Sequence, residues 1–213
     1  MILIAVTIIL IFIIIFIFSS PKLSPIPYYP SNKKDLPLII KALNLKNNQL
    51  VFDLGAGDGI IIFEAAKIAY GKKINAVFVA VEINPILVLI LHLKRFFHQN
   101  KKNIKIVWGD MFKINIKNQI SKIKPDDNPK IDNKKNLRRQ SKKLAIKKYS
   151  NITIYLYISP WLIEKILAVL KKQLPRFSLI SYYYPVKTLK EKEKITSGIH
   201  QIHTYEVCNE VCK

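Results

Sequence analysis

The sequence predicts an α/β protein with a Rossmann-like, mostly parallel sheet, helices on both faces of that sheet, and one transmembrane helix at the N-terminus. Short apolar strand patterns alternate with longer helical patterns from residue 35 onward, which is typical of parallel sheets. A glycine-rich turn joins the first of these strands to a helix, and an apolar run opens the chain. The 213 residues are enough for one domain and an anchor.

The apolar run at residues 1–18 contains no charged residue, Gly or Pro. As a helix rising about 1.5 Å per residue, it would come close to the ~30 Å thickness of a bilayer core. A secretory signal peptide is the alternative, but no Lys or Arg precedes the run, and residues 19–21 (Ser-Ser-Pro) are a poor cleavage site. Lys22, Lys33 and Lys34 follow the run, so the positive-inside rule predicts a single-pass membrane protein with its domain on the cytoplasmic side.

The segments after the anchor are assigned in order from their hydrophobic periodicity. A proline-rich connector covers residues 19–34, and the main domain covers residues 35–213. Short apolar runs predict five strands, with one or two more in the tail: Gln49–Leu54, Ala76–Val81, Ile104–Trp108, Ile152–Ile158 and Ser178–Tyr184. Longer runs predict four helices: Asp35–Leu45, Ile60–Tyr70, Pro85–His98 and Leu162–Leu174.

Local signals support individual helices. In the helix over Asp35–Leu45, apolar residues recur at helical spacing along one side. The helix from Ile60 begins just past the glycine turn. The helix over Pro85–His98 is strongly apolar and ends in basic residues, which suit the negative end of the helix dipole.

Residues 117–148 interrupt this alternation with a polar, basic and aperiodic segment. Such a segment buries too little apolar area to offset its ordering entropy, so we expect a disordered insertion. Its later half, residues 134–148, suits contact with anionic lipid headgroups; the alternative is a solvated loop without function. The net charge of +21 also suits nucleic acid, although an excess of Ile, Lys and Asn can reflect AT-rich codons instead.

The two cysteines lie near the C-terminus, so the sequence offers no disulfide framework. Together with two histidines they form an H-x2-H-x4-C-x3-C pattern: His200, His203, Cys208 and Cys212. Structural zinc sites use other spacings, and residues 198–207 alternate like a final strand. We therefore predict no metal site.

The strongest chemical signal is the segment Val51–Gly59, which reads V-F-D-L-G-A-G-D-G. Asp53 ends the strand, and Gly55, Gly57 and Gly59 allow a tight turn that a ligand can approach closely, with Asp58 inside the turn. The N–H groups at the start of the next helix favour an electron-rich ligand group. The G-x-G-x-G pattern after an acid resembles the first motif of class I S-adenosylmethionine-dependent methyltransferases, which implies that this turn cradles the methionine part of the cofactor.

The next two strands end in further polar residues at the edge where such sheets bind ligands. The second strand ends in V-E-I-N-P, where Glu82 and Asn84 are candidate cofactor residues and the resemblance places Glu82 on the ribose hydroxyls. The third ends in G-D-M, where the resemblance places Asp110 on the adenine amino group and Met111 on the adenine ring. Each acid alone could simply cap a helix, but together they predict a site for S-adenosylmethionine.

A narrower resemblance adds the segments Pro27–Ser31 (P-Y-Y-P-S) and Tyr155–Pro160 (Y-L-Y-I-S-P). With the cofactor motifs, they resemble the small membrane-associated protein-lysine methyltransferases related to those acting on the adenine nucleotide translocase and the ATP synthase c-subunit. The resemblance covers residues 27–185. It implies protein-lysine N-methylation of a membrane or membrane-proximal protein.

The methyl acceptor is expected beside the fourth strand, where Ser159, Pro160 and Trp161 follow Tyr157. We expect Tyr157 or the carbonyls near Ser159 to orient the acceptor. Tyr29 is expected to close over it, and Ser31 is assigned to the same region; the alternative is that the aromatics only pack the connector against the domain. A methyltransferase for a lipid-soluble small molecule and a non-catalytic, membrane-tethered basic module remain alternatives. RNA methylation fits the charge but not the anchor, so nucleic acid is not the expected partner.

Overall fold

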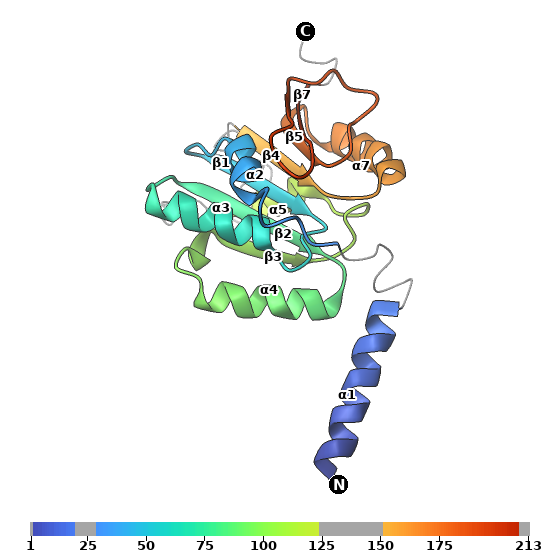
Figure 1. Ribbon diagram of the computed structural model, residues 1–213. Helices are drawn as coiled ribbons and strands as arrows, with labels where there is room; N and C mark the ends of the chain where they lie inside the picture. Colours follow the sequence, from blue (N-terminus) through green and yellow to red (C-terminus); the bar gives the residue numbers. More distant parts are fainter. Residues whose placement is uncertain (1, 20–28, 124–150, 209–213) are drawn as a thin grey trace, which may run out of the picture.

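The computed structural model describes residues 2–19, 29–123 and 151–208, and shows an α/β domain built on one sheet (Figure 1). The seven strands lie in the order β3-β2-β1-β4-β5-β7-β6. Their bounds are β1 Gln49–Leu54, β2 Ala76–Glu82, β3 Ile104–Trp108, β4 Asn151–Leu156, β5 Arg176–Tyr182, β6 Glu193–Ile195 and β7 Ile202–Cys208. The first five strands are parallel, and β7 runs antiparallel to β5 and β6.

The strand order reverses between β1 and β4. From β1 the chain adds β2 and β3 on one side, whereas β4 and β5 extend the sheet on the other. β1 is paired on both sides and all of its residues are buried. In open α/β sheets, ligands bind at the carboxyl ends of the strands beside such a switch point. The fold therefore directs attention to the ends of β1, β2 and β4.

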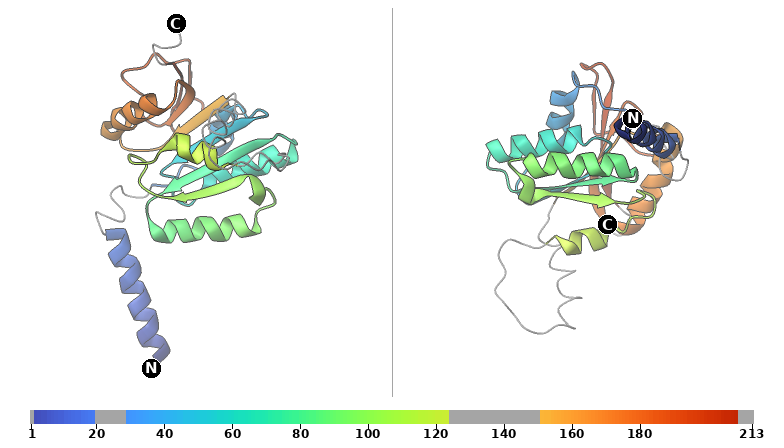
Figure 2. Two further views of the ribbon diagram at one scale, coloured as in Figure 1. Left: turned by 180° about the vertical axis from the view of Figure 1, so that it is seen from behind. Right: turned by 90° about the horizontal axis from the view of Figure 1, so that it is seen from below.

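Helices cover both faces of the sheet, as predicted (Figure 2). The described helices are α1 Ile2–Ser19, α2 Leu36–Leu43, α3 Ile60–Gly71, α4 Pro85–Phe97, α5 Ile116–Lys122 and α7 Pro160–Gln173, with a short 3-10 turn at Lys101–Asn103. One core cluster joins α2, α3 and Leu91 of α4 to one face of the sheet. The other joins α5 and α7 to the opposite face. Alternating residues of each strand supply the two cores, so the sheet is buried on both sides.

The strands and helices predicted within residues 35–184 all form, with boundaries shifted by a few residues. One boundary of the predicted insertion is wrong, because residues 116–122 form the helix α5. Ile116 and Ile120 of this helix are buried against the core. The segment has too few apolar residues to show a periodic pattern in the sequence. Residues 124–148 of the insertion and residues 20–28 of the connector lie outside the described residues, so those predictions are untested.

The N-terminal apolar run forms the helix α1, which contains 18 residues. A membrane span needs about 20 apolar residues. Among the residues that the structure describes, no helix is both long enough and apolar enough to cross a membrane. The predicted transmembrane helix is therefore not supported.

Candidate active site

The glycine-rich turn between β1 and α3 is held in the shape that the sequence predicted. Gly55, Gly57 and Gly59 all have positive φ angles, of 87°, 57° and 77°. The N–H groups of Gly55 and Ala56 both donate to the carbonyl of Val81, at 2.9 Å, which fixes the turn to the end of β2. Residues that carry a side chain rarely adopt such positive φ angles, so glycine is required to turn the chain this tightly.

The carboxylate of Glu82 organises the adjoining loop. Its Oε2 accepts a hydrogen bond from the N–H of Gly57 at 2.8 Å. Its Oε1 accepts from the N–H groups of Ile83 and Asn84, also at 2.8 Å. Hydrogen bonds to an ionised acceptor are the stronger kind. Glu82 therefore connects the glycine turn after β1 to the start of α4, a role that the sequence did not reveal.

Asp53 at the end of β1 lies buried close to other acids. Burial raises the pKa of its carboxyl from 3.8 to about 8, and the negative charges of Glu82 and Asp58 add to the increase. A chain of net charge +21 thus has a concentration of negative charge at the end of its central strand. A buried carboxyl beside like charges favours a cationic ligand, because a cation would offset the cost of ionising it.

The buried carboxyl of Asp53 predicts a specific pH dependence of stability. The unfolded chain loses this proton near pH 3.8, whereas the folded chain keeps it up to about pH 8. Between these values the folded state binds more protons than the unfolded state. The contribution of Asp53 to the free energy of unfolding therefore falls as pH rises, and this fall ends above about pH 8. We expect Asp53→Asn to remove this slope. Urea unfolding of both proteins at pH 5, 7 and 9 tests it; parallel stability curves would contradict the assignment.

Asn84, Asp110 and Met111 lie around the same loop. The Oδ1 atom of Asn84 caps α4 by accepting from the N–H groups of Ile86 and Leu87, while its buried Nδ2 has no hydrogen-bond partner in the described part of the chain. Asp110 Oδ1 accepts from the N–H of Phe112 at 2.9 Å. The methyl of Met111 lies 3.1 Å from where a Cβ on Gly55 would be, so the ends of β1 and β3 meet here.

Asp58 is positioned differently from the other acids of the turn. Its Oδ2 forms a 2.7 Å ion pair with the amino group of Lys94 on α4, and its backbone carbonyl accepts from the same group at 2.8 Å. This pairing ties the glycine turn to α4. In this structure, the carboxylate of Asp58 contacts protein rather than facing open space, and its predicted contact with a cofactor stays a prediction.

These residues fit S-adenosylmethionine. The cofactor carries a sulfonium and an ammonium group, which match the acids around Asp53 and Glu82. The buried Nδ2 of Asn84 is a hydrogen-bond donor without a partner in the described part of the chain. Asp53 and Glu82 lie at the ends of β1 and β2, and Asp110 follows β3, so the three acids belong to one edge of the sheet.

On the acceptor side, Ser159, Pro160 and Trp161 begin α7 directly after β4. The carbonyl of Ser159 accepts from the N–H of Leu162, and the hydroxyl of Ser159 forms no capping bond. Trp161 is 76% exposed. Tyr157 is half-buried and packs edge-to-face on Tyr182, with ring centroids 4.8 Å apart. Because β4 pairs with β1, this group lies beside the strand that carries the cofactor turn.

The structure separates the roles expected for Tyr29 and Ser31. Tyr29 is largely exposed and is among the neighbours that raise the pKa of Tyr157. Ser31 is buried, and its hydroxyl lies 2.9 Å from the hydroxyl of Tyr155. Ser31 therefore links the start of the domain to β4. The predicted places of Ser31 and Tyr29 around an acceptor stay predictions.

Sequence reasoning missed the residues that hold this side of the site together. The hydroxyl of Tyr182 donates to Asp35 at 2.7 Å, and Asp35 also accepts from the N–H groups of Ile199 and His200. The rings of Tyr182 and Tyr183 both pack against His200. The contacts of Asp35 join residues more than a hundred positions apart, so no local pattern predicts them. The run of three tyrosines that begins at the end of β5 was the available signal.

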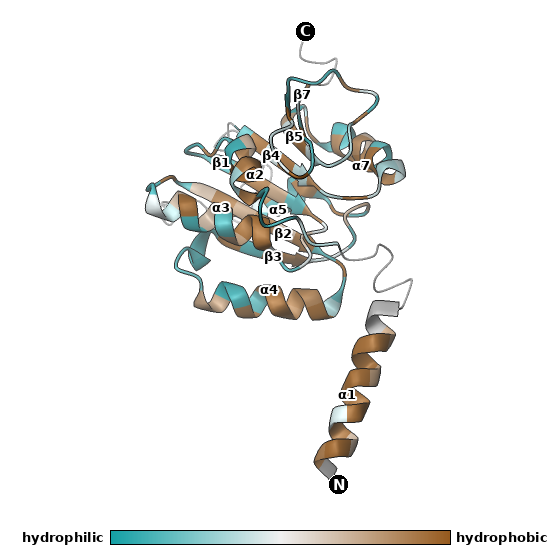
Figure 3. Cartoon of the chain, in the orientation of Figure 1, coloured by the Kyte–Doolittle hydropathy of each residue, from teal (hydrophilic) through white to brown (hydrophobic). Residues whose placement is uncertain are grey.

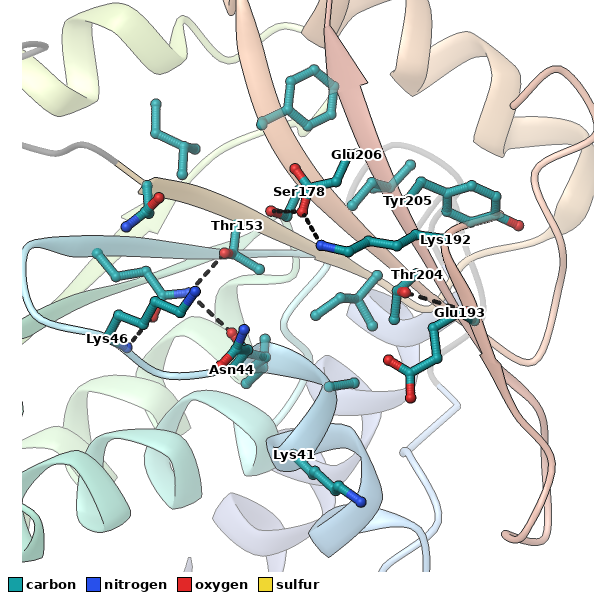
Figure 4. Close-up of a pocket in the computed structure, with 18 of the residues that line it drawn as sticks. Lys41, Asn44, Lys46, Thr153, Ser178, Lys192, Glu193, Thr204, Tyr205 and Glu206 are labelled. Atoms are coloured by element: carbon teal, nitrogen blue, oxygen red, sulfur yellow. Dashed lines mark hydrogen bonds and ion pairs between the residues drawn. The ribbon is translucent and has the colours of Figure 1, made fainter. Parts of the chain in front are cut away.

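A pocket lies elsewhere on the domain. It has a volume of about 490 Å³ and is lined by residues from the amino ends of β1, β4 and β5 and from β7 (Figure 4). Several of its polar groups pair with one another: Lys192 contacts Glu206 at 2.9 Å, and Gln49 donates to Thr153 at 2.8 Å. It lies at the edge of the sheet opposite the glycine turn. We therefore do not assign the cofactor to it.

The C-terminal His and Cys pattern is dispersed by the strand β7. The Nδ1 atom of His203 lies 2.6 Å from Glu191, His200 packs against tyrosines, and Cys208 ends the strand. Cys212 lies outside the described residues. Within residues 2–19, 29–123 and 151–208, no group of three or more His, Cys, Asp or Glu residues is arranged to hold a metal ion.

The fold and the site define an S-adenosylmethionine-dependent methyltransferase of class I. The sheet order, the glycine turn after β1 and the acids that follow β1, β2 and β3 support this class together. Residues 28–192 match the family model described as ribosomal RNA adenine dimethylase. The chain therefore belongs to the ribosomal RNA adenine dimethylase family.

Solved structures show the same fold. An RNA methyltransferase from Salinibacter ruber, bound to S-adenosyl-L-homocysteine, aligns with a TM-score of 0.61 at 17% identity, over 85% of this chain and 95% of its own. An uncharacterized protein from Listeria monocytogenes aligns with a TM-score of 0.51 at 10% identity, over 84% of this chain and 69% of its own. No curated protein matches the sequence. The family found is not the protein-lysine group that the sequence resemblance indicated, so that narrower assignment is unsupported.

Proposed function

We propose that the chain is an N-methyltransferase whose acceptor is the exocyclic amino group of an adenine in RNA. The observation that carries this proposal is Trp161, a flat aromatic side chain that is 76% exposed directly after Ser159 and Pro160 at the end of β4. Exposed aromatic rings bind unpaired bases by stacking. A base stacked on Trp161 would lie beside β1, the strand that carries Asp53.

Family membership and charge support the same acceptor. The matching family is named for adenine dimethylation in ribosomal RNA. The net charge of +21 favours a polyanion, because basic side chains that neutralise phosphates release counterions. Nucleic acid was not the partner expected from the sequence, and the family match favours it over a membrane protein.

Methyl transfer requires little from the protein beyond the alignment of the methyl donor with the acceptor amine. When bound, S-adenosylmethionine would supply a methyl group: the amine nitrogen gains a bond to the methyl carbon, the carbon–sulfur bond breaks with its electron pair left on sulfur, and the nitrogen loses a proton to water. Asp53, Glu82 and Asn84 would hold the cofactor, with Asp110 and Met111 at its adenine end. The carbonyls near Ser159 would orient the amine lone pair and accept hydrogen bonds from its N–H groups. Holding both partners in line supplies most of the rate enhancement.

The stacking role of Trp161 predicts a selective loss of activity. We expect Trp161→Ala to lower kcat/KM for an adenine-containing single-stranded RNA by roughly tenfold to a hundredfold, as expected for one lost stacking contact. Trp161→Phe should retain most activity. Transfer of labelled methyl groups measures both. Tyr70→Ala, at an exposed position near the far end of α3, is the matched control; equal losses in the Trp161→Ala and Tyr70→Ala proteins would contradict the proposal.

Protein-lysine N-methylation is a second candidate, favoured by the tyrosines beside Ser159. Burial raises the pKa of Tyr157, and neighbouring Tyr184, Tyr183 and Tyr29 contribute to the increase. The rings of Tyr183 and Tyr184 are 4.5 Å apart. Aromatic faces that converge in this way bind ammonium groups by cation–π attraction.

One experiment separates the two acceptors. The full chain is incubated with labelled S-adenosylmethionine and either RNA or a membrane protein fraction, and the labelled product is digested to nucleosides or amino acids. Methyladenosine supports the RNA proposal, and methyllysine supports the second candidate. Binding of S-adenosylhomocysteine without transfer to either acceptor would contradict both.

A further inference from the structure

The outer side of α4 carries an apolar surface that the domain does not cover. Four large side chains lie on it with spacings of three, four and seven residues, which place them on one face of the helix. Their exposed fractions are 69% for Leu89, 60% for Leu93, 67% for Phe96 and 77% for Phe97. The opposite side of α4 packs on the sheet through Leu87, Val88 and Leu91. α4 therefore has apolar side chains on two sides, one packed on the sheet and one exposed, and an exposed apolar patch of this kind marks an interaction site.

Basic residues surround this surface, and acids are absent from its sequence. Residues 85–109, which cover α4, the following turn and the edge strand β3, contain no Asp or Glu. They contain Arg95, Lys101, Lys102 and Lys105, together with Lys94, whose amino group pairs with Asp58. The amino group of Lys101 lies 5.4 Å from the centre of the Phe96 ring. The surface therefore combines exposed Leu and Phe side chains with positive charge.

The strongly apolar helix α1 continues the surface. α1 contacts α4, and in the described part of α1 the large side chains are exposed. Figure 3 shows hydrophobic residues over much of α4 and over nearly all of α1. α1 does not cover α4, because the four apolar side chains stay more than half exposed beside it.

We propose that α4, with α1, binds the surface of an anionic lipid bilayer. Leu and Phe side chains would enter the boundary between headgroups and acyl chains while the flanking lysines and arginine contact anionic headgroups. A second copy of the chain fits less well, because two copies of this surface would bring like charges together. RNA fits less well because Leu89 and Leu93 offer neither a flat ring to a base nor a hydrogen bond to a phosphate, although the two phenylalanines could stack on bases. The proposal concerns binding at the membrane surface and does not require a helix that spans it.

The test measures how deeply α4 enters the lipid. In the full chain with its native cysteines replaced by Ser, a fluorophore is attached at Leu93→Cys. The matched control carries it at Ala168→Cys, an exposed position on α7 across the sheet. Vesicles of phosphatidylcholine, with or without phosphatidylglycerol, carry brominated acyl chains that quench fluorescence on contact. We expect quenching at residue 93 but not at residue 168, dependent on phosphatidylglycerol and weakened by salt.

A second variant tests the apolar residues directly. Leu89→Glu combined with Phe96→Glu changes two exposed side chains, so folding should persist. It should weaken binding to phosphatidylglycerol vesicles by about tenfold or more, given the lost burial of two large apolar groups. Binding of vesicles with residue 93 unquenched would mean that α1 alone attaches, and would overturn the proposal. A dimer in lipid-free buffer that the double substitution dissociates, or quenching at residue 93 abolished by RNA, would also overturn it.

Discussion

Glu82→Ala is expected to abolish measurable cofactor binding. The substitution removes the acceptor of three backbone N–H groups, those of Gly57, Ile83 and Asn84. Each unsatisfied group costs about 1–3 kcal/mol when buried, so the glycine turn and the start of α4 lose their fixed relation. We expect affinity for S-adenosylhomocysteine to fall by about a hundredfold or more, and the free energy of unfolding by about 2–4 kcal/mol. Calorimetric titration and urea unfolding measure the two effects.

Two further variants separate the role of this carboxylate from a general loss of charge. Glu82→Gln can still accept from Ile83 and Asn84 through its carbonyl oxygen, but its amide would oppose the N–H of Gly57, so an intermediate loss is expected. Glu64→Ala removes an acid on the surface of α3 that pairs with Lys67 at 3.9 Å. Surface pairs contribute about 0–1 kcal/mol, so this control should bind normally. Folded Glu82→Ala protein with unchanged affinity would show that the cofactor lies elsewhere.

Gly59→Ala is expected to be the most destabilising of the small substitutions. A Cβ at this position would lie 2.4 Å from Cδ2 of Leu91 and 2.8 Å from the Phe63 ring, and the φ angle of 77° is unfavourable for alanine. Leu91 is fully buried, so it has little room to move. Overpacking and backbone strain together should lower the free energy of unfolding by about 2–4 kcal/mol.

Gly71→Ala is the matched control, because nothing lies within 4 Å of a Cβ there. Alanine at the end of α3 should change stability little or raise it by up to about 1 kcal/mol. Adding Leu91→Ala to Gly59→Ala should recover part of the loss by making room for the methyl group. Equal unfolding midpoints for the Gly59→Ala and Gly71→Ala proteins in urea would show that the turn has more freedom than its contacts indicate.

The fold was largely predictable because its signals are local. Buried parallel strands read as short apolar runs, and the helices between them have one-sided patterns, so most elements were placed within a few residues. The prediction failed at α5, where two buried residues, Ile116 and Ile120, hold a short helix that shows no clear period. The prediction of a membrane span at α1 is also unsupported, because no helix among the described residues is long and apolar enough to cross a membrane.

The candidate site was predictable only in part. Glycines with positive φ and acids at strand ends leave a signature in the sequence, so Gly55, Gly57, Asp53 and Glu82 were identified from it. The partners of these groups were not. The hydroxyl of Ser31 bonds that of Tyr155, and Asp58 pairs with Lys94. Such contacts depend on how distant segments pack, so the sequence does not reveal them.

The sequence by itself determined the class of fold, the cofactor turn and the acids around it, because each depends on residues close together in the chain. The tertiary structure decided the rest. It brought β4 beside β1, which places Trp161 near the cofactor turn, and it gathered Asp35, Tyr182 and His200 into one contact group. It also left the apolar face of α4 uncovered. Burial and proximity between distant residues arise only when the whole chain has packed, so no local pattern records them.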